Sequence, residues 1–172
     1  MKKTWLILLT AMTLLAVSVA VAPINADPLE KGLLAGSPHH GTPKWNPTQV
    51  GTVTVSNDVD NLYIAYVTWN PWVMTETHLA VATSLTGIPQ TKSGNPKVGQ
   101  FPYKHEDPRG FNNYQYTIPL SDLDAESGDT LYIAAHAVVE TPCREETAWG
   151  DCGISFEFPG NNWALYFEYA VQ

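Results

Sequence analysis

The sequence predicts an all-β fold, a single antiparallel β-sandwich of about seven strands. From Val50 onward, apolar residues alternate with polar ones, as in Val53 and Val55 between Thr52, Thr54 and Ser56. A period of two is typical of a strand with one buried face. No stretch of the domain keeps the 3.6-residue period of a helix, and Gly, Pro, Asn and Asp divide the chain into short segments, as turns divide the strands of a sandwich.

Seven segments are expected as strands, and one of them is apolar on both faces, which is typical of a central strand. They are residues 50–56, 62–69 (the central one), 75–83, 114–118, 131–139, 154–158 and 164–171. Residues 57–61 form a turn, and residues 119–123 are expected as one helical turn. The polar segment 84–112 is expected as a loop rich in Pro and Gly, and loops of that length are often functional.

The N-terminus predicts export. Lys2 and Lys3 precede an apolar run from Trp5 to Val21, and small residues offer cleavage sites after Ala26 or Ala22. A membrane anchor is the alternative, but the run is slightly shorter than the roughly 20 residues that span a bilayer. The expected parts are therefore a signal peptide (1–26), an extended arm containing Pro and Gly (27–48) and the β-sandwich domain (49–172), which would be secreted or on the cell surface, with no membrane span in the mature chain.

The mature chain is strongly acidic. The whole sequence has nine Lys and Arg against 17 Asp and Glu, and removal of residues 1–26 takes away two of the lysines and no acid, which leaves a formal charge of −10. Phosphate binding needs clustered Lys and Arg, so nucleic acid is not an expected partner.

The two cysteines, Cys143 and Cys152, are expected to form a disulfide, because an isolated pair in an exported protein most simply does so. A zinc site is the alternative, although this spacing without a nearby histidine suits zinc poorly.

A polar cluster is predicted at Glu76, His78 and His136. Both histidines lie within strand segments among small residues, and residues i and i+2 share a face of a strand. If the two strands are neighbours, the three side chains converge. Such a cluster either binds a metal or forms a buried polar network, and a core histidine with one hydrogen-bond partner is the expected form.

Two oxygen-rich turns offer weak calcium sites, at Asp58 and Asp60 and at Asp122 and Asp124. Asp and Asn are also the ordinary turn residues, and this second interpretation is preferred, so no cofactor is expected.

Three tryptophans are candidate glycan contacts, because exposed rings at the ends of strands can stack on sugars: Trp69, Trp72 and Trp149. Aromatic side chains also close the ends of a sandwich as ordinary core residues.

No catalytic machinery is predicted. The sequence lacks a G-x-S-x-G motif, and its serines lie in loops with no histidine near them in sequence.

Several stretches together resemble a recurrent β-domain of exported and cell-surface proteins of bacteria and archaea, methanogens included. They are Gly51–Val55, Asn57–Asp58, Asn61–Tyr63, Thr75–Leu79, Gly99–Lys104, Tyr116–Leu120, Gly128–His136, Glu146–Gly150 and Gly160–Ala164. The likeness covers about residues 50–172 and implies location and fold, with no associated activity.

The expected function is that of a non-catalytic extracellular module that acts through protein contacts, in surface assembly with itself or in adhesion to another cell-surface protein. A carbohydrate-binding module is the alternative, and a secreted enzyme comes third. The arm, with a short strand expected at Leu33 and Leu34, either packs on a sheet edge of its own chain or is disordered. The less favoured alternative is that it adds a strand to the sheet of a neighbouring copy, with residues 30–37 as the candidate segment.

Overall fold

The expected all-β antiparallel fold is confirmed by a computed structural model, which describes residues 27–36, 47–151 and 156–172. Its strands are β1 (Leu29–Ala35), β2 (Thr48–Asn57), β3 (Asn61–Thr68), β4 (Val73–Ala82), β5 (Tyr103–Phe111), β6 (Asn113–Pro119), β7 (Thr130–Thr141), β8 (Arg144–Asp151), β9 (Phe156–Glu157) and β10 (Leu165–Ala170). Three short 3-10 turns, Leu85–Gly87, Val98–Gln100 and Leu120–Leu123, are the helical elements of this part of the chain. None of its helices is long and apolar enough to cross a membrane.

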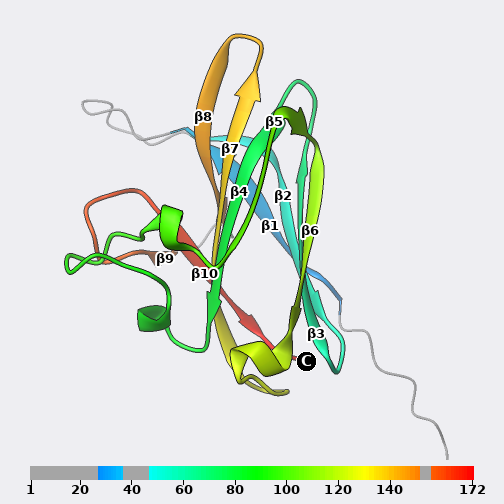
Figure 1. Cartoon of the computed structure of the whole chain (residues 1–172), viewed down its shortest axis with the longest axis vertical. Helices are drawn as coiled ribbons and strands as arrows, with labels where there is room; N and C mark the ends of the chain where they lie inside the picture. Colours follow the sequence, from blue (N-terminus) through cyan, green and yellow to red (C-terminus); the bar gives the residue numbers. More distant parts are fainter. Residues whose placement is uncertain (1–26, 37–46, 152–155) are drawn as a thin grey trace, which may run out of the picture.

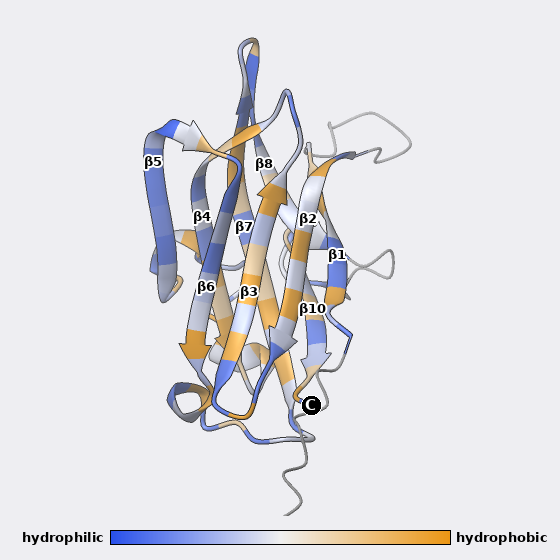
Figure 2. Ribbon diagram, turned by 90° about the vertical axis from the view of Figure 1, so that its right-hand side faces the viewer, coloured by the Kyte–Doolittle hydropathy of each residue, from blue (hydrophilic) through white to orange (hydrophobic). Residues whose placement is uncertain are grey.

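The strands form one continuous sheet that curls round on itself (Figures 1 and 2). Their order is β5-β4-β7-β8-β1-β2-β3-β6, and β10 pairs with the first part of β7 while β8 pairs with the second. Because β8 is hydrogen-bonded to β1, the expected division into two sheets with about seven strands does not describe this molecule. The end strands β5 and β6 meet through side chains, with the His105 ring stacked 3.9 Å from that of Tyr114.

The N-terminal arm contains an interior strand. β1 pairs with β2 on one side and with β8 on the other, so its backbone groups are bonded within the same chain. Of the alternatives weighed for the arm, packing within its own chain describes Leu29–Ala35, and this strand includes the short strand expected at Leu33 and Leu34. Residues 37–46, and the signal peptide expected over 1–26, lie outside the described residues.

β5 is a strand that was expected as part of a loop. Figure 2 shows it as hydrophilic along most of its length. Lys104, Glu106 and Pro108 are exposed on it, and only one of its edges is paired, with β4. Charged residues and proline are tolerated at a sheet edge because the unpaired side of the strand faces solvent.

Two apolar clusters hold the fold together. The larger fills the interior of the curled sheet and includes Val53, Ile64 and Leu131. The smaller lies on the outer face of β4, β7 and β8 and contains Trp149, with Phe101 and Phe158 from the segments that connect the strands. A β-bulge near Thr75 sets which side chains of β4 point outward, and it places Thr77 inside the sheet and the neighbouring His78 outside.

Candidate functional site

A cavity of about 380 Å³ lies on the outer face of the sheet, over β4, β5, β7 and β8. Its lining, called the carboxylate pocket from here on, consists of Thr75, Glu76, Glu106, Pro108, Val138, Glu140 and Glu145. Four carboxylates converge there because each strand contributes alternate residues to the same face.

The register places these carboxylates in two cross-strand pairs. Glu76 on β4 lies directly opposite Glu106 on β5, and Glu140 on β7 lies directly opposite Glu145 on β8. Val138 is opposite Glu76 and so lies between the two pairs. Like charges directly opposite each other destabilise a sheet, so this arrangement has an energetic cost that the fold does not require.

Few cationic side chains compensate these charges. Lys104 approaches Glu106 at 3.3 Å, and both side chains are exposed. Arg144 lies over the Trp72 ring and approaches Glu146, which is outside the pocket lining. Within the described residues, Glu76, Glu140 and Glu145 have no ion pair with Lys or Arg.

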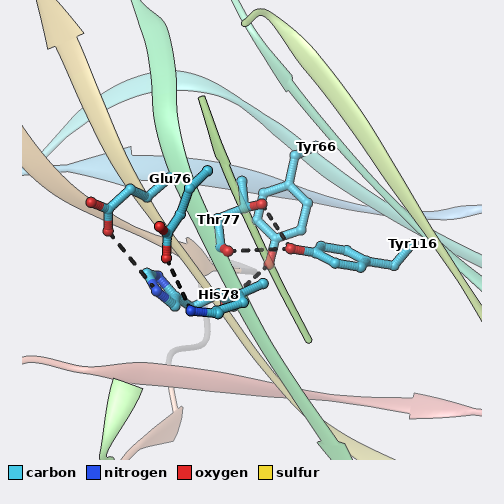
Figure 3. A network of polar contacts seen from close by, with 7 residues as sticks. Tyr66, Glu76, Thr77, His78 and Tyr116 are labelled. Atoms are coloured by element: carbon cyan, nitrogen blue, oxygen red, sulfur yellow. Dashed lines mark hydrogen bonds and ion pairs between the residues drawn. The ribbon is translucent and has the colours of Figure 1, made fainter. Parts of the chain in front are cut away.

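The predicted cluster of Glu76, His78 and His136 is brought together beside the pocket, and Figure 3 shows Glu76 and His78 on β4. His78 and His136 face each other across β4 and β7 with ring centroids 5.5 Å apart, and they are 8% and 6% exposed. The Nε2 atom of His78 lies 3.9 Å from Oε2 of Glu76, a pocket carboxylate. The prediction that the histidines are buried on neighbouring strands is confirmed.

Burial lowers the pKa of both imidazoles. The pKa of His136 falls to about 3, first because burial disfavours the charged ring and second because of the nearby His78. The pKa of His78 is also lowered by burial, while Glu76 and Glu106 act against this shift. Both rings are therefore neutral at pH 7.

One ring nitrogen of each histidine lacks a hydrogen-bond partner among the described residues. The Nδ1 atoms of His78 and His136 are buried and find no partner among the described residues. Unsatisfied buried polar atoms are rare in native proteins. Two such atoms on neighbouring strands indicate that this part of β4 and β7 is not optimised for stability alone.

The opposite face of β4 carries a structural hydrogen-bond network (Figure 3). The Tyr116 hydroxyl donates to the carbonyl of Thr77 at 3.2 Å, and the Thr77 hydroxyl lies 2.8 Å from the Tyr116 oxygen, to which it donates in turn. The Tyr66 hydroxyl donates to the carbonyl of His78 at 3.5 Å. Burial raises the pKa of Tyr116 to about 12, so this network holds β4 in place and has no ionised member at neutral pH.

The three tryptophans do not form a row. Trp69 is 48% exposed, but Trp72 and Trp149 are only 7% and 3% exposed. Trp149 is covered in the outer apolar cluster, where Phe101 and His136 both meet it edge to face. The expectation that Trp72 and Trp149 contact a glycan is wrong, because each ring packs against the protein itself.

The four aspartates act in turns or lie apart. Asp58 accepts hydrogen bonds from the backbone of Asp60 and Asn61 and from the Tyr63 hydroxyl, which is the geometry of a capped turn. Asp122 belongs to the 3-10 turn at 120–123, and Asp124 follows it with a φ of 49°. In the part of the chain that is described, no group of three or more His, Cys, Asp or Glu could hold a metal ion.

The expected disulfide between Cys143 and Cys152 is not found among the described residues. Cys143 is a free, exposed thiol at the turn between β7 and β8, and Cys152 lies outside the described residues. The eight-residue strand β8 separates Cys143 from Asp151. At roughly 3.4 Å per residue this strand spans about 25 Å, whereas the Cα atoms of a disulfide are at most about 7 Å apart. The spacing was interpreted as a small loop, whereas residues 144–151 form a strand.

The pocket itself was missed by reasoning from the sequence. Glu106 fell in the segment expected as a loop, and Glu145 lies outside every segment that was expected as a strand. The available signal was the charged, alternating pattern of residues 103–111, which is typical of an edge strand. Comparison of the chain with protein-family models, with curated proteins and with solved structures finds no match.

Proposed function

We propose that the mature domain is a non-catalytic module of the cell exterior that acts through protein contacts and binds a basic segment of a partner protein in the carboxylate pocket. The carrying observation is the pair of directly opposed glutamate pairs that line one cavity. Such pairs weaken a sheet unless a cation lies between them.

A Lys or Arg side chain suits the pocket in charge and in size. Cavities that bind small ligands are typically ~300–1,000 Å³, and this cavity, with a volume of about 380 Å³, has room for the end of a long side chain. The apolar side chains of Pro108 and Val138 can contact the aliphatic part of a long basic residue while carboxylates bind its charged end. Charge-assisted hydrogen bonds to carboxylates are among the stronger polar contacts.

The chemistry of the lining supports binding more than catalysis. The histidines are buried beside the carboxylates, and neither ring lines the cavity. The one hydroxyl in the lining belongs to Thr75. A position on the cell exterior is part of this proposal and follows from the predicted signal peptide.

The test is calorimetric binding of an octa-arginine peptide at pH 7.5, with an octa-glutamate peptide as the control ligand. The double variant Glu76→Gln/Glu140→Gln is expected to bind at least tenfold more weakly. Glu126→Gln/Glu168→Gln changes net charge by the same amount at exposed positions outside the lining, and it is expected to change binding less than twofold.

The same variants separate binding from stability. Removing Glu76 and Glu140 relieves two like-charge pairs, so the free energy of unfolding should rise by ~0.5 kcal/mol. Equal losses of binding in the two double variants would show that only net charge matters and would contradict the proposal, as would the absence of any binding by the wild-type protein.

A further inference from the structure

We infer that the carboxylate pocket is proton-gated: a cation in the pocket and a proton on the His78–His136 pair exclude each other, so the module releases its basic partner on acidification. This inference rests on the proposed function and adds its regulation.

The geometry couples the two events through one carboxylate. Glu76 lines the pocket, and its Oε2 also lies 3.9 Å from Nε2 of His78. His78 is nine-tenths buried, and its Nδ1 has no partner in the described part of the chain. Glu76 is therefore available either to a cation in the pocket or to a protonated His78.

The charged groups around the pair are few. β4 contributes Glu76, and β5 contributes Lys104, opposite His78, together with Glu106. β7 contributes His136 itself, with Glu140 further along the same face, and β8 places the neutral Trp149 opposite His136. From the connecting segment 83–102, Phe101 packs on Trp149 and brings no charge. The carboxylates that favour a proton on His78 are thus two residues of the pocket.

Electrostatics then fixes the sign of the effect. With the pocket empty, Glu76 and Glu106 favour a proton on His78 and partly offset the effect of burial on its pKa. A bound guanidinium neutralises these carboxylates and removes that support, and its own positive charge also repels the proton. By linkage, a proton on His78 must weaken the binding of the cation by the same factor.

The pair takes up one proton before two. The rings are 5.5 Å apart, and a charge on His78 lowers the pKa of His136. One exchangeable proton limits the loss of affinity to at most tenfold per pH unit below the pKa of His78. The effect should appear as the pH falls through the pKa of His78, which lies below the ordinary value of 6.5.

The experiment measures octa-arginine affinity from pH 8.0 to 5.0, within the range in which circular dichroism shows folded protein. Wild-type affinity is expected to fall at least fivefold, and that of His78→Gln less than twofold. His105→Gln is the matched control, because its ring stacks on Tyr114 and lies away from the pocket, and it should follow the wild type. In parallel, NMR titration of the wild-type imidazoles with and without peptide should show that the peptide lowers the pKa of His78.

The outcomes separate the two proposals. Equal pH dependence in wild type and His78→Gln, or an unchanged pKa of His78 in the presence of bound peptide, would overturn the gate and leave the binding site standing. No binding at pH 8.0 would overturn both. The wild-type NMR titration decides the question even if the His78 variant fails to fold.

Discussion

Acidification should destabilise this protein through the buried His136. Burial lowers the pKa of His136 from 6.5 to about 3, so below pH 6.5 the unfolded chain binds a proton that the folded chain does not. Stability is fully present above pH 6.5 and is lost progressively as the pH falls toward about 3. At pH 5 the solution is about 1.5 pH units below the pKa of the histidine in the unfolded chain, which corresponds to a loss of ~2 kcal/mol in the free energy of unfolding. His78 acts in the same direction because its pKa is also lowered.

The assay is urea unfolding followed by tryptophan fluorescence at pH 7.5, 6.5, 5.5 and 5.0, with wild type, His136→Leu and His105→Gln. Leucine cannot titrate and replaces a buried imidazole whose Nδ1 has no partner among the described residues. The variant should therefore lose ~2 kcal/mol less than the wild type between pH 7.5 and 5.0. If His136→Leu and wild type lose the same free energy of unfolding, the neutral buried state of His136 is refuted.

Three further predictions concern single contacts. Thr77→Val should lower the free energy of unfolding by ~1–2 kcal/mol, because it leaves the buried Tyr116 hydroxyl with one partner fewer. In a double-mutant cycle with Tyr116→Phe, strictly additive losses of stability would contradict a direct hydrogen bond between the two hydroxyls. Gly51→Ala should cost on the order of 3 kcal/mol, since its Cβ would lie against the carbonyl oxygen of Val67, whereas Gly99→Ala, with open space around it, should be nearly neutral by thermal unfolding. Cys143→Ser should leave the free energy of unfolding of the non-reduced protein within ~0.5 kcal/mol of wild type. A thiol reagent should label Cys143 without prior reduction. A loss of several kcal/mol would instead indicate that Cys143 forms a disulfide.

The alternation of apolar and polar residues was enough to predict the strand-rich fold and the burial of the histidines. His78 and His136 occur among small residues inside strand patterns, and such positions are buried wherever the strands pair. The two rings approach each other because β4 and β7 are neighbours in the sheet. The sequence analysis had left this pairing as a condition.

What the sequence by itself determined about this protein is local: the period of two, the turn chemistry at Asp58 and the acidic charge all depend on near neighbours in the chain. The tertiary structure alone decided the pairing of β1 inside the sheet, the free thiol of Cys143 and the meeting of Glu76, Glu106, Glu140 and Glu145 in one pocket. These features depend on register and strand order, which are set by the packing of both faces of a curled sheet, and a shift of one residue in register would move every side chain of a strand to the opposite face.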